Sequence, residues 1–176
     1  MWVFTQMAWV ECHFARHFKT AEEPPGLMSG VVMPEPAQVP AGKDAVLLVE
    51  DTEATRLVIR FMLEALGFDV HCACTGKQAV DMTLVHYYVA VLMDVEMPEM
   101  DGLEATKAIR YREGQYDLPP VRVVGITCHH SHSISILCRY AGMDDILPKP
   151  FFLHQLAEKL AVEAPATLSR LVKAPH

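Results

Sequence analysis

From Asp44 onward the chain alternates five times between short apolar runs and segments with helical periodicity. The apolar runs cover residues 45–49, 68–73, 89–93, 121–126 and 145–147. Such an alternation is typical of repeated strand-helix units, in which each helix returns the chain so that the next strand pairs in parallel. We therefore expect an α/β fold: a doubly wound sheet of five parallel strands with helices on both faces.

The segments between these runs predict amphipathic helices, because their apolar residues recur at intervals of three and four. Glycine commonly closes a helix, so the first helix is expected to end at Gly67 and the fourth at Gly142. The second is expected over residues 77–86, the third around 103–109, and the fifth is expected to continue weakly past Pro165. The core-facing positions predicted for the first, fourth and fifth helices are Leu57, Val58, Phe61, Met62, Ala65 and Leu66; Ile134, Leu137, Cys138 and Ala141; and Leu153, Leu156, Ala157 and Leu160.

The chain divides by composition into three parts. Residues 1–43 form an expected flexible lead-in or linker, with five prolines between positions 22 and 42. Residues 44–163 form the predicted α/β domain, and residues 164–176 a tail that carries at most a short helix. The apolar stretch 1–10 is much shorter than a membrane span and lacks a basic leader. We therefore expect neither a signal peptide nor a membrane anchor.

Composition narrows the class of protein. The chain has 176 residues, of which 51% are hydrophobic and 21% charged, a globular balance. Its formal charge of -7 and the lack of a Lys/Arg cluster argue against direct nucleic-acid binding. The number of cysteines is odd and they show no CxxC spacing, so we expect reduced thiols in a cytoplasmic protein.

Two groups of cysteine and histidine residues could be considered as metal ligands. Cys72 and Cys74 would point to one face of a strand, but buried filler is the favoured interpretation. His129, His130 and His132 lack a second ligand group at suitable spacing, so a solvated loop that enters a helix is favoured over a zinc site.

Polar groups follow the predicted strands at the point where each one ends. The first strand is followed by Glu50 and Asp51, the third by Asp94, the fourth by Thr127 and the fifth by Lys149. Taken singly, each has an ordinary explanation as a helix cap, a loop hydroxyl or a surface charge. Ligands of open α/β sheets bind at the carboxyl ends of the strands, and there these groups would meet.

The carboxylates in this set predict a cation. Three negative charges at one sheet edge repel one another unless a cation or a proton offsets them. Mg²⁺ prefers a few carboxylates together with waters and phosphate oxygens. Glu50, Asp51, Asp94 and a backbone carbonyl just beyond Asp94 could supply the protein ligands, and Lys149 is long enough to add a positive charge.

The segments VLLVED, VLMDVEMPEMDG, GIT and DDILPKPF resemble the receiver domain of two-component response regulators. This resemblance covers residues 44 to about 162 and implies a flavodoxin-like sheet with strand order 2-1-3-4-5. The Pro-rich lead-in and the segment MPEMDGLEATKAIR resemble the carboxyl-terminal receivers of hybrid histidine kinases. A free-standing regulator stays open as an alternative.

The resemblance implies a role for each strand-end residue. Asp94 is the expected phospho-acceptor. Asp51 and Asp94 are expected to bind Mg²⁺ directly, Glu50 through water and Glu96 through its main-chain carbonyl. Thr127 is expected to supply a hydroxyl to the phosphoryl group and Lys149 its counter-charge, with a cis bond before Pro150.

The resemblance also implies a phosphorelay. The phosphoryl group is expected to come from a phosphohistidine on a histidine kinase or a histidine phosphotransfer protein, and the signal to pass to a downstream protein partner. The chain is then not an enzyme with a separate substrate, because it catalyses its own phosphorylation and dephosphorylation.

Three positions depart from the family pattern. Ile146 stands where a switch aromatic is usual, Cys128 where alanine or glycine follows the threonine, and Glu50 where aspartate is commoner. We therefore expect the readout to depend on movement of the loop and helix over residues 127–140 rather than on a rotating ring.

Two other classes of function compete with this one. A non-phosphorylated receiver-like scaffold would bind a partner constitutively, but the intact Asp94, Thr127 and Lys149 argue against it. A Mg²⁺ phosphatase with an aspartyl nucleophile would need an acid two positions after Asp94. Glu96 stands there, but a Met-Pro turn follows it, and the chain offers no substrate-capping domain.

Overall fold

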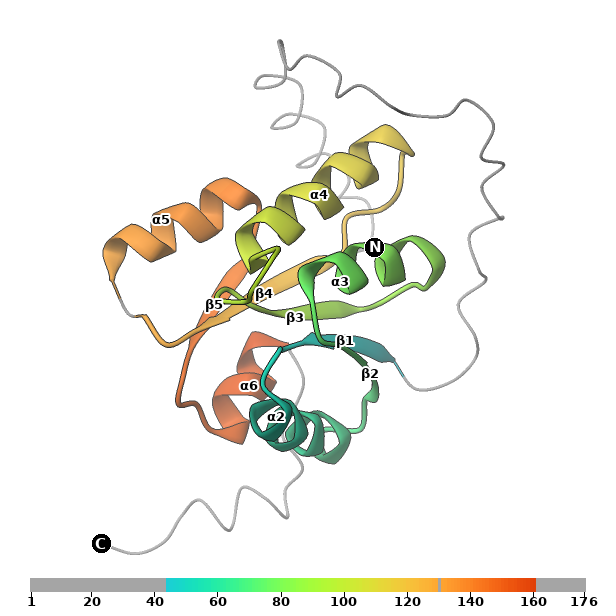
Figure 1. The fold of residues 1–176 in the computed structure, drawn as a ribbon. Coiled ribbons are helices and arrows are strands. Elements are labelled where there is room, and N and C mark those ends of the chain that lie inside the picture. Colours follow the sequence, from blue (N-terminus) through green and yellow to red (C-terminus); the bar gives the residue numbers. More distant parts are fainter. Residues whose placement is uncertain (1–43, 130, 161–176) are drawn as a thin grey trace, which may run out of the picture. The chain divides into compact units, whose positions relative to one another are not determined.

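The computed structural model describes residues 44–129 and 131–160 (Figure 1). The strands are β1 (Ala45–Val49), β2 (Asp69–Ala73), β3 (Ala90–Asp94), β4 (Arg122–Thr127) and β5 (Asp145–Pro148), and the helices are α2 (Glu53–Ala65), α3 (Gly76–Val85), α4 (Gly102–Gln115), α5 (His132–Ala141) and α6 (Leu153–Lys159). The five predicted strands are all present, with ends that differ from the prediction by at most one residue. The predicted lead-in and tail lie outside the described residues.

The five strands form one parallel sheet in the order β2-β1-β3-β4-β5. Helices α2 and α6 cover one face, and α3, α4 and α5 cover the other (Figure 1). The predicted doubly wound fold and strand order are therefore confirmed. Because β1 and β3 are neighbours at the centre of the sheet, the residues that follow them meet at its carboxyl edge.

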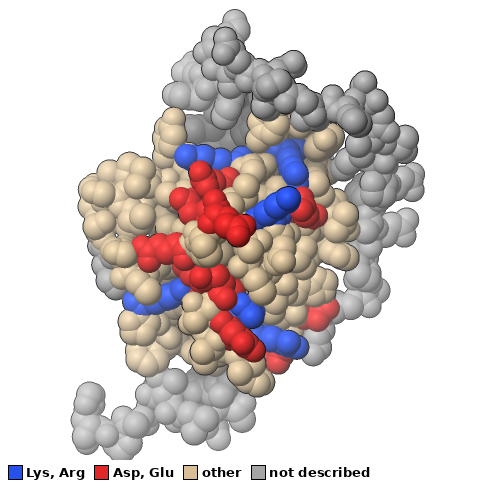
Figure 2. All heavy atoms as spheres, viewed as in Figure 1, with Lys and Arg blue, Asp and Glu red and all other residues tan. Residues whose placement is uncertain are grey.

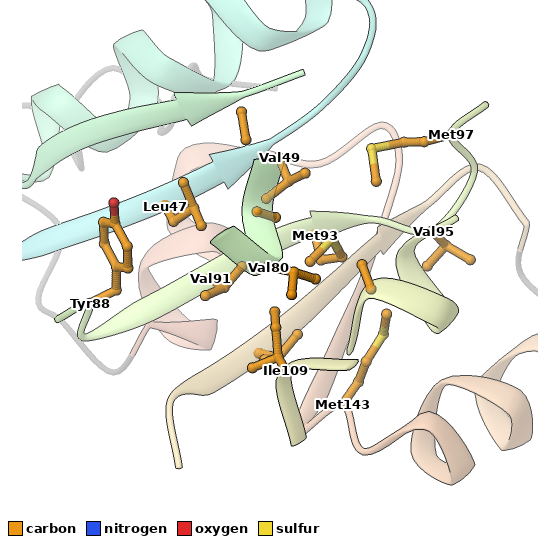
Figure 3. Close-up of a cluster of buried hydrophobic side chains, with 14 of the residues drawn as sticks. Leu47, Val49, Val80, Tyr88, Val91, Met93, Val95, Met97, Ile109 and Met143 are labelled. Carbon is orange, nitrogen blue, oxygen red and sulfur yellow. The ribbon is translucent and has the colours of Figure 1, made fainter. Parts of the chain in front are cut away.

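Both faces of the sheet are buried, as the continuous apolar runs predicted. In β3 every residue is buried, and its side chains alternate between two apolar clusters. The cluster under α3, α4 and α5 is drawn in Figure 3 and includes Leu47, Val49, Val91, Met93 and Ile109. The cluster under α2 and α6 includes Val46, Leu48, Ile59, Leu63, Leu92 and Leu156.

The buried face predicted for α2 is wrong in part: Met62 and Leu66 pack against the core as expected, but other predicted positions do not. Leu57, Val58 and Phe61 are 51%, 54% and 61% exposed, whereas Ile59 and Leu63 are 3% and 0% exposed. Two apolar stripes overlap on this helix, and periodicity alone does not decide between them. The stripe with β-branched Ile59 packs on the sheet, so α2 presents a second apolar stripe to solvent.

Two other helix faces were predicted more closely. In α5, Cys138 and Ala141 are buried, but Leu137 is 49% exposed, contrary to prediction. In α6, Leu156 and Ala157 are buried as expected. Gly142 closes α5 in the left-handed conformation, with φ of 98°, which explains the glycine there.

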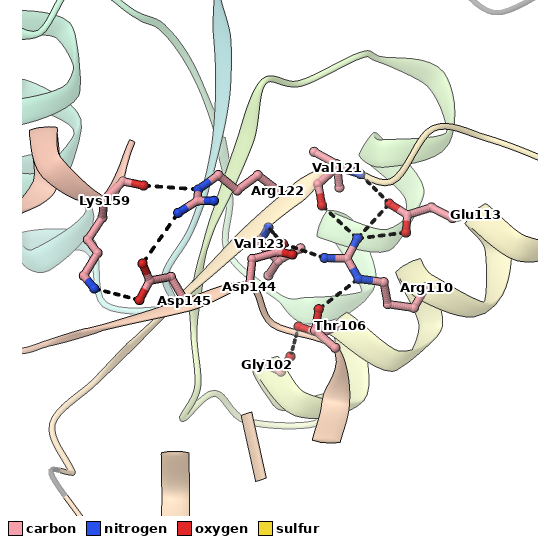
Figure 4. Close-up of polar contacts among 11 residues, drawn as sticks. Gly102, Thr106, Arg110, Glu113, Val121, Arg122, Val123, Asp144, Asp145 and Lys159 are labelled. Carbon is pink, nitrogen blue, oxygen red and sulfur yellow. Dashed lines mark hydrogen bonds and ion pairs between the residues drawn. The ribbon is translucent and has the colours of Figure 1, made fainter. Parts of the chain in front are cut away.

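The amino ends of β4 and β5 are tied together by ionic side chains (Figure 4). Arg110 pairs with Glu113 and Asp144, both at 2.8 Å, and donates to the carbonyl of Val121 at 2.7 Å. We call Arg110, Glu113 and Asp144 the amino-edge cluster. On the other face of the sheet, Asp145 pairs with Lys159 at 2.7 Å.

Acidic and basic side chains lie close together on the face seen in Figure 2, and no continuous basic field appears on its described part. Among residues 44–129 and 131–160, no helix is long and apolar enough to cross a membrane.

Candidate functional site

The strand ends bring the predicted polar residues together at the carboxyl edge of the sheet. Asp94 ends β3, Thr127 ends β4, and Glu50 and Lys149 directly follow β1 and β5. Asp94 is opposite Ile126 in the sheet, and Thr127 is opposite Pro148, which precedes Lys149. The site is therefore assembled by the register of the central strands.

Three carboxylates converge at this edge. Oxygen atoms of Glu50, Asp51 and Asp94 all lie within 4.8 Å of one another. Glu50 and Asp94 are buried, at 1% and 4% exposure, whereas Asp51 is exposed. The structure thus places three of the four predicted metal ligands together; for the fourth, Glu96, its main-chain carbonyl as a ligand stays a prediction.

Lys149 lies among these carboxylates and offsets part of their charge. Its Nζ is 2.7 Å from Oε2 of Glu50 and 3.0 Å from Oδ2 of Asp94. Burial raises the pKa of Glu50, and the charge of Asp94 acts in the same direction, against the hydrogen bond from Lys149. Burial lowers the pKa of Lys149, but its hydrogen bonds to Glu50 and Asp94 outweigh burial and raise it. We call these three carboxylates and Lys149 the carboxyl-edge cluster.

Thr127 is fully buried at the end of β4. Its Oγ1 accepts a hydrogen bond from the backbone N–H of His129 at 3.0 Å, and its carbonyl accepts one from the N–H of Lys149 at 2.7 Å. The Lys149–Pro150 bond is cis, as expected. Thr127 and Lys149 therefore sit on connected backbone segments beside Asp94.

The turn after Asp94 explains the Asp-Gly pair at its end. A Cβ on Gly102 would lie 2.1 Å from the carbonyl oxygen of Asp94, closer than any real contact, so a side chain there would displace the turn. Asp101 caps α4 by accepting from the N–H of Glu104 at 2.7 Å. The close approach of α4 to β3 thus fixes the backbone that carries Asp94.

Sequence reasoning missed several residues that contact the site. Arg56 donates from Nη1 to the carbonyls of Glu50 at 2.7 Å and Asp51 at 3.2 Å. Thr52 donates its hydroxyl to Oδ1 of Asp51 at 3.3 Å. The spacing of Arg56 from the acids carried no signal, because a bond to a main-chain carbonyl leaves no trace in residue types.

One side-chain pair bridges two loops beside the site. The imidazole Nδ1 of His129 pairs with Oε1 of Glu96, which joins the loop after β4 to the loop after β3. Both side chains are largely exposed. The histidine-rich loop therefore contributes a side-chain contact here; His130 lies outside the described residues.

The position expected for a switch aromatic is part of the core. Ile146 is partly buried and packs against the apolar cluster under α3, α4 and α5.

An apolar groove between α2 and the segment after β5 opens beside Lys149. Its lining includes Val58, Met62, Cys128 and Phe151.

Comparison with known proteins identifies the family. The family model described as response regulator receiver domain matches residues 46–161. The chain belongs to the response regulator receiver family. It is 41% identical over 111 residues to the aerobic respiration control sensor protein ArcB of Escherichia coli strain K12. The aligned residues make up 63% of this chain and 14% of ArcB. This receiver chain therefore spans only a small part of such a relative.

Two solved structures resemble the receiver closely. The receiver domain of sensor histidine kinase PA1611 from Pseudomonas aeruginosa PAO1, with magnesium in its active site cleft, has a TM-score of 0.61 and 37% identity, and covers 68% of this chain and 95% of its own. The Saccharomyces cerevisiae complex of the histidine phosphotransfer protein Ypd1 and the receiver of Ssk1 has a TM-score of 0.64 and 28% identity, and covers 68% and 88%. Similarity to receivers of sensor kinases agrees with the expected hybrid-kinase type.

The residues present fit a magnesium ion. All three convergent ligands are carboxylates, which hard divalent cations prefer, and two of them are buried in a cluster whose negative charge exceeds that of Lys149. Among the described residues this is the one group of three or more potential metal ligands that converges. The described cysteines, Cys72, Cys74, Cys128 and Cys138, are free thiols, as expected.

Proposed function

We propose that this receiver takes a phosphoryl group from a phosphohistidine onto Asp94 with the help of Mg²⁺, and then changes conformation to signal to a protein partner. The observation that carries this proposal is the carboxyl-edge cluster. Asp94 is buried at a sheet edge, next to two further carboxylates within 4.8 Å and in contact with Lys149 at 3.0 Å. Phosphoryl transfer needs positioning and charge neutralisation, and this arrangement supplies both.

The transfer itself involves one bond formed and one broken. A carboxylate oxygen of Asp94 bonds to the phosphorus while the bond from phosphorus to the donor imidazole nitrogen breaks, and the electron pair returns to the imidazole. Lys149 then exchanges its contact with Asp94 for a phosphoryl oxygen, and the Thr127 hydroxyl turns toward another. When bound, Mg²⁺ would neutralise the charge that develops on the phosphoryl oxygens. Glu50 and Asp51 would hold it there together with Asp94 and the main-chain carbonyl of Glu96.

Dephosphorylation of Asp94 is a hydrolysis, with water as the acceptor of the phosphoryl group. Water attacks the phosphorus, the bond to the Asp94 oxygen breaks, and inorganic phosphate leaves with the carboxylate restored. The receiver therefore catalyses its own phosphorylation and dephosphorylation rather than the turnover of a separate substrate.

The exposed apolar stripe of α2 supports a protein donor. Leu57, Val58 and Phe61 are about half exposed or more, and the groove beside them leads to Lys149. An exposed apolar patch next to a reactive site marks a docking surface. We assign it to a histidine kinase or histidine phosphotransfer protein, in the cytoplasm; the Ypd1–Ssk1 complex shows that another receiver binds such a partner.

The readout in this proposal does not use a rotating ring. Ile146 offers no aromatic, so movement of Thr127 toward the phosphoryl group has to break its contact with the His129 N–H and shift the loop that leads into α5. Beryllofluoride, which mimics a phosphoryl group on aspartate, should change backbone NMR shifts over residues 127–140. Unchanged shifts there would refute this route.

Phosphorylation is tested with acetyl phosphate and Mg²⁺ on the full chain, followed by a phosphate-affinity gel. We expect a shifted band in the natural chain and none in Asp94→Asn. Turnover of added phosphoesters would support the phosphatase class instead. A lack of any shift in the natural chain would contradict the proposal and favour a constitutive scaffold.

A further inference from the structure

The main chain between β1 and α2 bends at the metal ligands. The N–H of Glu50 still donates to the carbonyl of Ala73 in β2 at 3.1 Å, but the carbonyls of Glu50 and Asp51 have left the sheet ladder. A single guanidinium nitrogen, Nη1 of Arg56, lies 2.7 Å from the first carbonyl and 3.2 Å from the second. Arg56 thus bridges two consecutive peptide groups that carry site carboxylates.

The bridge connects these carboxylates to the core. Arg56 is in the first turns of α2, where its own N–H donates to the carbonyl of Thr52 at 2.9 Å. One and two turns later, Ile59 and Leu63 are buried against the sheet. Asp51, in contrast, is exposed. Its place therefore depends on the backbone that Arg56 restrains.

Local side-chain bonds favour the site at the expense of the helix. Thr52 is the N-cap of α2, but its side chain makes no capping hydrogen bond. Its hydroxyl donates to Oδ1 of Asp51 at 3.3 Å instead. An N-cap bond stabilises a helix by about 1 kcal/mol. The α2 start is therefore arranged around the carboxylates rather than for its own stability.

We infer that Arg56 is a positioning residue for the magnesium site. By holding the carbonyls of Glu50 and Asp51, it keeps two mutually repelling carboxylates turned toward Asp94, as partners behind metal ligands commonly do. This inference rests on the proposed magnesium-dependent function and adds a residue that touches none of the ligand oxygens.

Loss of positioning and loss of charge should change the Mg²⁺ affinity in opposite directions when Arg56 is removed. Removing a positive charge beside an acidic cluster should, by Coulomb's law alone, strengthen the binding of a divalent cation. Loss of positioning should weaken it. A weaker site after removal of Arg56 therefore cannot come from the charge change.

The test is a calorimetric titration of the full chain with Mg²⁺ alone, with thermal unfolding in EDTA measured in parallel. We expect Arg56→Met to weaken Mg²⁺ binding about 10- to 100-fold, as typical for such partners. The matched control is Arg60→Met, one turn further along α2, where Arg60 pairs with Glu64 at 2.7 Å on the surface. It removes the same charge, and we expect an affinity within about twofold of the natural chain because exposed charges are screened.

Each outcome decides the inference. Equal or tighter Mg²⁺ binding by Arg56→Met, or equal weakening by Arg60→Met, overturns it. If Arg56→Met does not fold in EDTA, Arg56→Lys takes its place, because lysine keeps the positive charge on a shorter side chain. Unchanged Mg²⁺ affinity in Arg56→Lys then overturns the inference. If the natural chain binds no Mg²⁺, the proposed function fails together with the inference, whereas equally tight binding by the natural chain and Arg56→Met refutes the role of Arg56 alone.

Discussion

Among the residues that the structure describes, the amino-edge cluster and the carboxyl-edge cluster lie at opposite edges of one sheet and differ in how their carboxylates are satisfied. In the amino-edge cluster, Glu113 and Asp144 accept from both the Arg110 guanidinium and a backbone N–H, at 2.7 to 2.8 Å. In the carboxyl-edge cluster, the backbone donors to Glu50 and Asp94 stand at 3.3 Å.

This contrast separates a structural cluster from a reactive one. Buried ionised groups are stable when hydrogen bonds complete their pairing, and an incompletely paired group is ready to take another partner. The amino-edge cluster holds α4 to β4 and β5. The carboxyl-edge cluster has three carboxylates against the single positive charge of Lys149, so a cation can still bind there. Substitutions at each edge test this difference.

The largest effect is expected from Arg110→Met. The change leaves Glu113 without its ionic partner in a largely buried place, and breaking such a pair costs about 3 kcal/mol or more in unfolding free energy. The measurement is urea unfolding of the full chain with and without Mg²⁺. The loss should be the same in both conditions; recovery with Mg²⁺ would mean that the two edges are not separate.

A smaller loss is expected from Gly102→Ala. The new Cβ would lie 2.1 Å from the carbonyl oxygen of Asp94 if nothing moved. Overpacking of this kind costs about 1 to 3 kcal/mol in unfolding free energy. The turn that carries Asp94 should shift, so Mg²⁺ affinity should fall as well. Gly67→Ala is the control, because a Cβ there meets nothing within 4 Å, although its φ of 98° adds local strain. Its Mg²⁺ affinity should not change, and a fall there would contradict a specific role for Gly102.

An effect of opposite sign is expected when the charge of one site carboxylate is removed. Asp94→Asn relieves repulsion with Glu50, and Lys149 keeps its ion pair with Glu50 at 2.7 Å, so the metal-free fold should gain on the order of 1 kcal/mol. Asp144→Asn should destabilise the fold, because Asp144 accepts from Arg110 and from the N–H of Val123. Urea unfolding of both variants in EDTA measures the difference. The same sign in both would remove the distinction between the clusters.

Much of the fold could be predicted from the sequence because its strands are continuous apolar runs with clear ends. Asp94 marks the end of β3 since a carboxylate does not fit between two buried faces. The side of α2 that is buried could not be predicted, because its two apolar stripes share Met62 and Leu66, and only packing on the sheet selects the one with Ile59.

The candidate site could also be predicted only in part. Side chains at strand ends are visible in the sequence, so Glu50, Asp94 and Lys149 were predicted to meet, and they do. Contacts to main-chain atoms are not visible, since any residue supplies a carbonyl. Arg56 and the His129–Thr127 hydrogen bond therefore emerged from the structure alone.

The smallest effect is a difference in pH dependence between the two edges. Burial raises the pKa of Glu50, so its ionised form costs stability above the folded-state pKa, and that cost disappears as the pH falls through it. Burial alone would also raise the pKa of Asp145, but hydrogen bonds from Lys159 and from the Ile146 N–H outweigh it and lower that pKa. Asp145 therefore stabilises the fold above its unfolded-state pKa, and this contribution is lost as the pH falls through the folded-state pKa.

Glu50→Gln and Asp145→Asn convert this difference into opposite curves. In EDTA near neutral pH, we expect Glu50→Gln to stabilise the fold and Asp145→Asn to destabilise it, and both differences from the natural chain should shrink on acidification. The measurement is unfolding free energy against pH for the three chains. Glu50→Gln less stable than the natural chain at neutral pH would show that the Lys149 ion pair outweighs the burial of Glu50. Glu50 would then be as well satisfied as Asp145, and the need of the carboxyl-edge cluster for a cation would lose its physical basis.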